Sequence, residues 1–504
     1  MVVSGTATAA NNTTEIITSG PSGIGGNGES YYSDISEDGN IITFRSSATD
    51  LIPGITTTGQ QIFTYDRTTQ TTTLITTGTS GTGGNGDSSN PSISGNGNII
   101  TFYSSATNLL PGITTTGQQI FTYDRTTQTT TLITSGSSGI GGNHASTWPS
   151  ISGDGNIITF QSWATDLIPG ITTDSYQIFA YDRTTQTTTL ITTGTSGTGG
   201  NDGSFHPSIS GNGNVIAFQS AASDLIPGVT ITGNFQLFAY DRTTQTTTHI
   251  TKDGSGSGVG GYSDYVALSN DGNIIVFYSY ANDLIPGITT NGYPQIFAYN
   301  RNTQSNSLIT RGSLGTGGNG ESTTPSIDGN GNLITFSSSA TDLIPGITTI
   351  GQQIFTYDRT TQTTTLITTG TSGTGGNNLS IRPVISNQGN VITFESRATD
   401  LVPNLTTNGV RQIFAFILRE DPDDGDHNSD PESVPEVQAT TFATKTIGMQ
   451  NTGIPLVGIV LAFLMVIGGF VSTRKKTIRG TPLAGLILAI LMISSGFVSN
   501  RKNR

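Results

Sequence analysis

The chain has 504 residues, a mass of 52.5 kDa and a formal net charge of −13. Because a single hydrophobic core rarely grows beyond about 250–300 residues, this length indicates several domains or an array of repeats. Charged residues make up only 11% of the chain, and the absence of cysteine excludes disulfides, thiolate metal sites and cysteine nucleophiles. Low charge combined with many β-branched residues argues against disorder and favours an all-β chain.

The charge is divided unevenly along the chain. Residues 1–440 contain 13 Lys and Arg and all 34 Asp and Glu, whereas residues 441–504 contain 8 Lys and Arg and no acid. This division indicates an acidic body with a basic, membrane-facing tail. The arginines of the body are scattered and form no basic stripe, so we expect no nucleic acid among the partners.

Residues 1–12 precede the first predicted strand. Their apolar stretch is too short for a signal peptide, but Ala7-Thr8-Ala9 has the small-x-small form of a cleavage site. We therefore interpret residues 1–12 as a leader or the remnant of a signal peptide.

Residues 13–418 are dominated by an internal repeat. A Leu-x-Pro-Gly or Leu-x-Pro-Asn phrase recurs seven times, with its proline at 53, 111, 169, 227, 286, 345 and 403. Each copy holds four short β-rich runs separated by Gly-Asn, Asp-Gly or Thr-rich turns, which are hairpin signals. Four strands in each of seven repeats predict a seven-bladed β-propeller; a β-solenoid is the competing fold.

The two ends of the repeat region complement each other. The seventh copy ends with its third strand at 412–416, while residues 13–18 match the fourth strand of the other copies and precede the first complete copy. We therefore expect the N-terminal strand to complete the last blade and close the ring, which removes an open sheet edge.

The repeats resemble the TolB-like, WD-like propeller repeats of exported bacterial and archaeal proteins. The resemblance lies in Pro91-Ser92-Ile93-Ser94-Gly95-Asn96-Gly97, in the segment 164–170 and in Gln177-Ile178-Phe179-Ala180-Tyr181-Asp182-Arg183. It implies the propeller fold and little about function, because propellers carry unrelated activities.

Several motifs that suggest chemistry have simpler interpretations. Gly81 to Gly86 matches G-x-G-x-x-G, but the chain then enters another strand instead of the helix that phosphate binding requires, so we expect no nucleotide partner. The four histidines form no metalloprotease motif, and there is no G-x-S-x-G. We therefore expect no catalytic residues, no metal centre and no cofactor, and we expect that the chain is not an enzyme.

An acid or amide recurs before each Leu-x-Pro phrase. The positions are Asp50, Asn108, Asp166, Asp224, Asp283, Asp342 and Asp400. A ring of carboxylates could hold a cation. An acid at this position more often accepts hydrogen bonds from loop N–H groups, and because Asn108 can do the same, we expect this structural role.

The copies differ most at the start of their first strand and the end of their second. These two sites are neighbours because the strands are antiparallel. Aromatic residues gather there in the third to fifth copies and predict a ligand-binding face. The predicted site comprises Trp148, Trp163, Phe205, His206, Tyr262, Tyr265, Tyr278 and Tyr280. Packing of the same residues as local core is the alternative.

The C-terminal region has a different composition. Residues 419–452 form an acidic, proline-containing segment that we interpret as a stalk, with a Ca²⁺ site as the weaker alternative. Residues 453–504 contain two uncharged apolar runs, 454–471 and 483–498, each followed by basic residues, and they predict hydrophobic helices that anchor the chain in a membrane. The basic flank of the first run predicts that the propeller lies on the extracytoplasmic side.

Together these features predict a membrane-anchored, cell-surface propeller that acts as a binding or adhesion module for a glycan or a protein. One alternative is a passive structural protein of the cell envelope, whose aromatic face would be packed or covered. The other is a propeller-type hydrolase or lyase, which requires acids or histidines that converge near the central channel.

Overall fold

The computed structural model describes residues 12–418 except 22, 114, 138, 172–174, 230, 232–234, 254, 255, 348, 406 and 408. The expected leader (apart from Asn12), the acidic stalk and the hydrophobic anchor helices lie outside the described residues. In the part of the chain that is described, no helix has the length and apolar character needed to cross a membrane.

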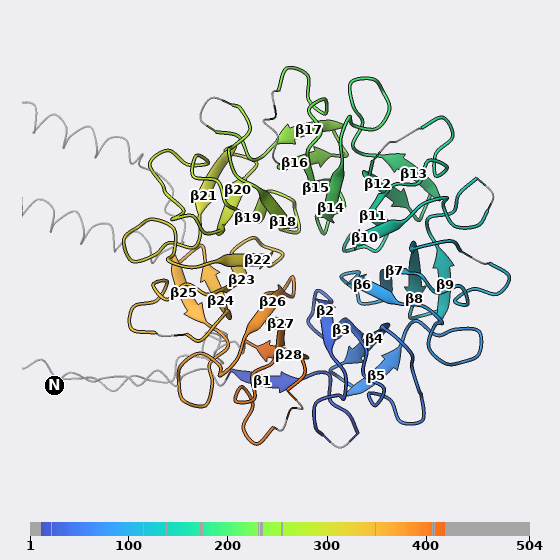
Figure 1. Ribbon diagram of the computed structural model, residues 1–504, viewed down its shortest axis with the longest axis horizontal. Coiled ribbons are helices and arrows are strands. Elements are labelled where there is room, and N and C mark those ends of the chain that lie inside the picture. Colours follow the sequence, from blue (N-terminus) through green and yellow to red (C-terminus); the bar gives the residue numbers. More distant parts are fainter. Residues whose placement is uncertain are drawn as a thin grey trace, which may run out of the picture. The chain divides into compact units, whose positions relative to one another are not determined.

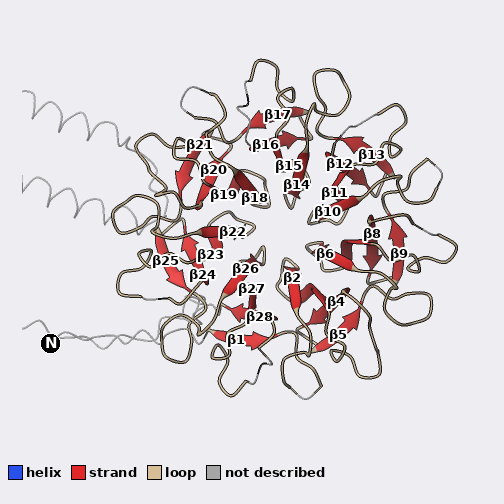
Figure 2. Cartoon of the chain, in the orientation of Figure 1, coloured by secondary structure: helices blue, strands red, loops and turns tan. Residues whose placement is uncertain are grey.

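Seven four-stranded antiparallel sheets surround a central axis and form a β-propeller (Figures 1 and 2). Blade 1 contains β2 (Ser30–Ile35), β3 (Ile41–Ser46), β4 (Gln61–Asp66) and β5 (Thr71–Leu74). Blade 2 contains β6 (Ser88–Ile93), β7 (Ile99–Ser104), β8 (Gln119–Asp124) and β9 (Thr129–Leu132). Blade 3 contains β10 (Ser146–Ile151), β11 (Ile157–Ser162), β12 (Gln177–Asp182) and β13 (Thr187–Leu190). Blade 4 contains β14 (Ser204–Ile209), β15 (Val215–Ser220), β16 (Gln236–Asp241) and β17 (Thr246–His249). Blade 5 contains β18 (Ser263–Leu268), β19 (Ile274–Ser279), β20 (Gln295–Asn300) and β21 (Ser305–Leu308). Blade 6 contains β22 (Ser322–Ile327), β23 (Leu333–Ser338), β24 (Gln353–Asp358) and β25 (Thr363–Leu366). Blade 7 contains β26 (Ser380–Ile385), β27 (Val391–Ser396), β28 (Gln412–Ile417) and β1 (Thr13–Ile16).

The last blade confirms the predicted ring closure. Strand β1 pairs antiparallel with β28, so the N-terminal strand forms the outer edge of blade 7. The buried Gln412 side chain strengthens the junction, because its Oε1 accepts a hydrogen bond from Thr18 Oγ1 at 2.5 Å and its Nε2 donates one to the Gly26 carbonyl at 2.9 Å. The two ends of the propeller are therefore joined by sheet pairing and by side-chain bonds.

The core lies between neighbouring blades. The second strands of the blades are buried on both faces, because each sheet packs against a sheet on either side; Thr101 and Phe102 of β7, which point to opposite faces, are both 0% exposed. One such layer joins Ile41 and Ile62 of blade 1 to Ile93 and other apolar residues of blade 2. Similar apolar layers repeat around the ring and hold the inner strands β2, β6, β10, β14, β18, β22 and β26 about the axis.

The recurring acid or amide before Leu-x-Pro has the predicted structural role. Asp166 Oδ1 accepts a hydrogen bond from the backbone N–H of Asn143 at 2.9 Å, and Asn108 Oδ1 makes the same bond to Asn85 at 2.9 Å. The amide oxygen of Asn108 thus replaces a carboxylate oxygen without loss of the bond, which confirms that the loop requires an acceptor and not a charge.

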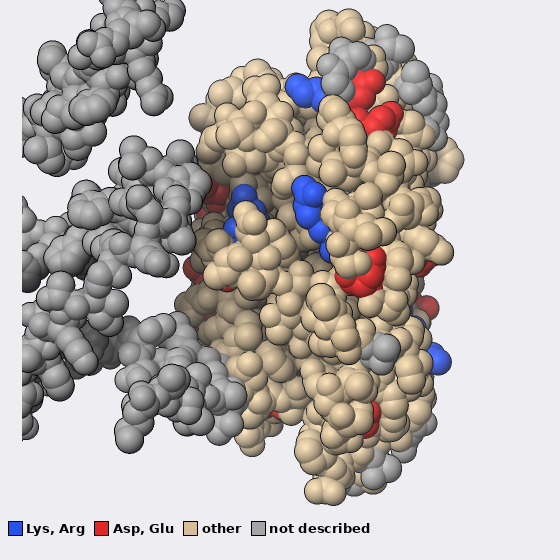
Figure 3. Space-filling view, turned by 90° about the vertical axis from the view of Figure 1, so that its left-hand side faces the viewer, with Lys and Arg blue, Asp and Glu red and all other residues tan. Residues whose placement is uncertain are grey.

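The edge of the propeller carries few charges. Figure 3 views the side formed by blades 5 and 6, where single basic and acidic side chains are scattered over an otherwise uncharged surface. This side therefore shows no continuous charged band, and the residues that distinguish the blades from one another lie around the axis instead.

Candidate functional site

Every inner strand contains a β-bulge at its third residue. The ladder between the first and second strands of each blade shifts register there, and the third residue has a positive φ between 47° and 53°. A bulge re-aims a side chain, and a positive φ is uncommon for residues other than glycine. The seven bulge residues, which we call the collar, are Tyr32, Asn90, Trp148, His206, Tyr265, Thr324 and Arg382.

The collar side chains meet across the axis. The Trp148 ring lies 4.4 Å from the His206 ring, 6.1 Å from Tyr32 and 6.3 Å from Tyr265, measured between centroids. Arg382 extends its guanidinium over the Tyr32 ring, with Cζ 4.3 Å from the centroid. Because these residues come from five different blades, their contacts narrow one end of the central channel, which we call the mouth.

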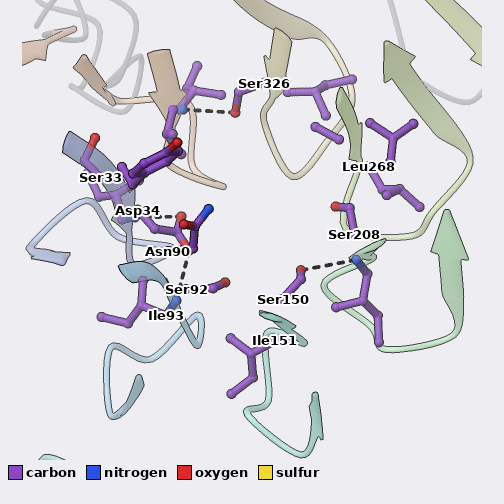
Figure 4. Close-up of a pocket in the computed structure, with 18 of the residues that line it drawn as sticks. Ser33, Asp34, Asn90, Ser92, Ile93, Ser150, Ile151, Ser208, Leu268 and Ser326 are labelled. Atoms are coloured by element: carbon purple, nitrogen blue, oxygen red, sulfur yellow. Dashed lines mark hydrogen bonds between the residues drawn. The ribbon is translucent and has the colours of Figure 1, made fainter. Parts of the chain in front are cut away.

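The central channel has a volume of about 350 Å³, and both polar and apolar side chains line its wall. Figure 4 shows hydroxyl groups around its middle, among them those of Ser92, Ser150 and Ser208, together with the Asp34 carboxylate. Burial raises the pKa of Asp34. The backbone N–H groups of Ile93 and Ile35 donate hydrogen bonds to its carboxylate and partly offset this effect. No group of three or more His, Cys, Asp or Glu side chains that could hold a metal ion occurs among the described residues.

Backbone hydrogen bonds join the blades around the opposite end of the channel, which we call the closed end because these bonds form a closed circle. The circle runs from blade to blade, for example from Gly95 N to Gly153 O at 2.8 Å and from Gly153 N to Gly211 O at 2.8 Å. The circle closes where Gln388 N donates to Glu37 O at 3.0 Å. Glycine permits this approach, because a Cβ on Gly153 would lie 2.9 Å from the Gly211 carbonyl oxygen.

A second aromatic feature lies outside the collar, on the same face. Seven rings follow one another across blades 3 to 5, with centroids between 5.6 and 6.3 Å apart. We call this series the aromatic arc, and its members in order are Trp163, Tyr176, Phe205, Phe235, Tyr262, Tyr278 and Tyr280. Its two ends are the most open, since Trp163 and Tyr280 are each 44% exposed.

The arc and the collar meet at blade 5. The Tyr278 ring stacks on Tyr265 of the collar at 5.9 Å. Beside this contact, Asp264 is 2% exposed and binds two partners: its Oδ1 lies 2.8 Å from His206 Nδ1, and its Oδ2 accepts a hydrogen bond from Tyr262 Oη at 2.7 Å. Burial and the Asp264 charge raise the pKa of Tyr262 to about 12, so Tyr262 stays a neutral donor to this carboxylate.

The predicted site residues all lie on the mouth face, but they fall into two groups. Trp148, His206 and Tyr265 belong to the collar, where they contact one another over the channel instead of forming an open platform. The other five belong to the arc: Trp163, Phe205, Tyr262, Tyr278 and Tyr280. Their binding role stays a prediction.

Sequence reasoning missed Tyr176 and Phe235, which complete the arc. Each directly precedes the third strand of its blade. The residues at the same place in the other blades are Gln60, Gln118, Pro294, Gln352 and Arg411, so this position also varies between copies. The internal comparison that located the rest of the arc would have found them if it had included the start of the third strand.

No protein-family model matches the chain, and no curated protein matches it. Solved structures with a similar fold include an oligogalacturonate lyase in complex with manganese, at 13% identity and a TM-score of 0.48, covering 81% of this chain and 97% of that one. TolB from Acinetobacter baumannii is 17% identical, with a TM-score of 0.36, covering 68% of this chain and 64% of that one. The β-propeller domain of the Trilobed protease from Pyrococcus furiosus is 10% identical, with a TM-score of 0.47, covering 77% of this chain and 93% of that one.

These comparisons correct the expectation that the chain is not an enzyme. The similar structures include the lyase as well as dipeptidyl peptidase 4 from Porphyromonas gingivalis, so neither the propeller fold nor the absence of a sequence motif excludes catalysis. At these identities the likeness concerns the fold alone, and no activity of those proteins is carried over to this chain.

Proposed function

We propose that this chain is a propeller-type binding protein for a glycan and that the aromatic arc is its contact surface. The observation that carries the proposal is the continuity of the arc. Each aromatic ring contacts the next across three blades, and the rings at both ends are exposed. Aromatic rings present flat apolar faces on which the C–H faces of sugars stack, and the polar edges of Tyr262 and Tyr280 can bind hydroxyl groups.

The repeat itself supports a functional origin of the arc. The equivalent of Trp163 is Ser105 in blade 2 and Ser339 in blade 6, so the fold does not require an aromatic residue there. A large apolar side chain that the fold does not need and that stays exposed is typical of a contact surface.

Binding of the full-length chain to a panel of oligosaccharides, followed by calorimetry and by tryptophan fluorescence, tests the proposal. We expect Trp163→Ala to weaken binding of the responding glycan about tenfold, since a well-packed aromatic contact contributes about 1–2 kcal/mol. Tyr293→Ala is the matched control, because Tyr293 is also an exposed aromatic residue, at 42%, but lies outside the arc. If Trp163→Ala binds the glycan as tightly as Tyr293→Ala does, the arc is not the contact surface. If no oligosaccharide of the panel binds, the passive structural role is favoured.

The proposal also places the propeller at a cell surface, attached through residues 419–504. The support is the composition of that region, with an acidic segment followed by two apolar runs with basic flanks. Recovery of the full chain in the membrane fraction, and release of the propeller from intact cells by protease, are the expected results. A full chain found only in the soluble fraction contradicts membrane attachment.

A second candidate function is acid–base catalysis at the mouth. It is favoured by the pairing of His206 with buried Asp264, which orients the imidazole through Nδ1 and leaves Nε2 for a ligand. Turnover of a bound glycan that disappears in His206→Asn, while binding persists, would support this function. Binding without turnover across the panel would contradict it.

A further inference from the structure

A cluster of arginines lies on the opposite side of the mouth from blade 4, where blades 7 and 1 meet (Figure 1). Arg45 places its Cζ 4.7 Å from the ring centroid of Tyr31 and 4.8 Å from that of Tyr32. Arg382 lies over Tyr32 at 4.3 Å, and Arg411 lies over Tyr31 at 4.8 Å. The two tyrosine rings therefore hold three guanidinium groups at the mouth by cation–π contacts.

The cluster contains fewer carboxylates than cations. Glu395 is 0% exposed, and its oxygens lie 3.0 Å from Arg411 Nη1 and 3.6 Å from Arg382 Nη1. Within the described part of the chain, Arg45 forms no ion pair; its Nη1 donates to Ser89 Oγ at 2.9 Å, and its buried Nε has no hydrogen-bond partner. Burial lowers the pKa of Arg45; the Glu395 charge opposes this effect, and the nearby Arg382 charge adds to it. The cluster of three arginines and one carboxylate therefore carries an excess of positive charge, while the Asp264 carboxylate lies at blade 5 beside His206.

The fold does not require a charge at the position of Arg45. The equivalent residues of blades 2, 3 and 4 are Tyr103, Gln161 and Gln219. An incompletely neutralised arginine in a half-buried place is costly unless a ligand compensates it. A carboxylate is the natural partner, because its two oxygens match the parallel N–H donors of a guanidinium.

We propose that the glycan bound by this protein carries carboxylate groups and that Arg45 and Arg382 form the subsite that receives one of them at the mouth. This inference rests on the proposed glycan-binding function and specifies the class of glycan: a uronate-containing chain. The collar joins the two regions, since Tyr32 contacts Trp148, and Tyr265 contacts Tyr278 of the arc. One end of a chain lying on the arc can therefore reach the arginines.

The test compares alginate and hyaluronan hexasaccharides, which carry carboxylates, with the same oligosaccharides after their carboxyl groups have been reduced to alcohols. We expect the full-length protein to bind at least one acidic oligosaccharide about tenfold more tightly than its reduced form, which is the usual size of one charge-assisted hydrogen bond. The difference should shrink as the salt concentration rises.

Arg45→Gln is the decisive variant, because glutamine occupies this position in blades 3 and 4 and no carboxylate loses its partner. It should abolish most of the preference for the acidic form while leaving the affinity for the reduced form unchanged. Arg311→Gln is the control, since Arg311 is an exposed arginine whose Nη1 donates a hydrogen bond to the nearby Gly315 carbonyl. Equal binding of acidic and reduced forms overturns the carboxylate subsite and leaves glycan binding intact. Failure of every acidic and reduced form to bind, when the wider oligosaccharide panel contains a neutral binder, overturns the carboxylate subsite alone, and a wider panel without any binder overturns both proposals.

Discussion

The two ends of the central channel are built from the same repeat by opposite means. At the closed end, backbone groups of successive blades bind one another, and the residues at the contact are mostly glycine, such as Gly95 and Gly153. At the mouth, seven residues share one backbone conformation but carry different side chains, from Asn90 to Trp148.

The difference shows how a repeat protein can separate stability from recognition. The circle of backbone hydrogen bonds continues through glycine in most blades and through Glu37 and Asn270 in others, so the closed end depends on the backbone more than on the identity of a side chain. The bulge at the mouth directs each third residue toward the axis, whatever that residue is, and the side chains there can diverge without altering the sheet. Three substitutions test how far this separation extends.

His249 is a buried residue at a position where other blades have leucine, for example Leu74 in blade 1 and Leu366 in blade 6. The substitution His249→Leu restores the leucine. His249 stacks on Phe238 at 5.0 Å, both of its ring nitrogens lack hydrogen bonds, and burial lowers its pKa to about 4. An unfolded histidine has a pKa of about 6.5, so the unfolded state binds the proton more readily and the native state loses stability as the pH falls from 6.5 towards 4.

We expect His249→Leu to stabilise the propeller at pH 7, and its advantage over the wild type to grow by about 2 kcal/mol between pH 7 and pH 5. Denaturant unfolding across this pH range measures the difference. Leu308→His, at the same position of blade 5, should introduce the same acid sensitivity. A stability difference that does not change with pH would show that His249 is not held neutral by burial.

Gly153→Ala tests the closed end. The new Cβ would lie 2.9 Å from the Gly211 carbonyl oxygen, which accepts the inter-blade bond, so neither group can move without stretching the circle. We expect a loss of about 1–3 kcal/mol, as in other overpacked sites, measured by thermal unfolding. Thr126→Ala, at an exposed turn, is the control. An unchanged unfolding midpoint would mean that the circle adds little to stability.

Thr324→Asn tests the mouth and should have the smallest effect. Thr324 is β-branched and has a φ of 49°, a conformation that asparagine adopts more easily. We expect stability to rise by less than about 1 kcal/mol, because relief of strain is offset by loss of the 2.8 Å bond between Thr324 Oγ1 and Ser337 Oγ. Thr323→Asn, one residue earlier, should bring no gain. A loss above 1 kcal/mol would show that the collar side chains contribute to the fold.

Most of the architecture could be predicted from the chain itself. The period of 58 or 59 residues, the four β-rich runs and the unmatched strand at 13–18 led to seven blades and to their closure by β1, as observed. Local sequence patterns are enough to predict the blades, because the turns and apolar strands that form a blade lie within one repeat. The aromatic face was also found, since it depends on neighbouring strand ends within a blade.

What joins different blades could not be predicted. The pairing of His206 with Asp264 spans 58 residues, and the contacts between Trp148 and Tyr32 cross the axis. The β-bulge that aims these residues inward has no turn signal, because it occurs at tyrosine, tryptophan or arginine as readily as at asparagine. Motifs within one repeat therefore carry no information about pairs such as His206 and Asp264, which different blades bring together.

The number of blades and their strand order follow from the repeat along the chain, and the closure of the ring follows from the unmatched strand at 13–18. The folded ring alone shows which of the divergent residues form the collar, which form the arc, and that Arg45 lies beside two other arginines without a carboxylate of its own. The ring brings one residue from every blade to a common axis, and no spacing along a single chain records how seven side chains share that space.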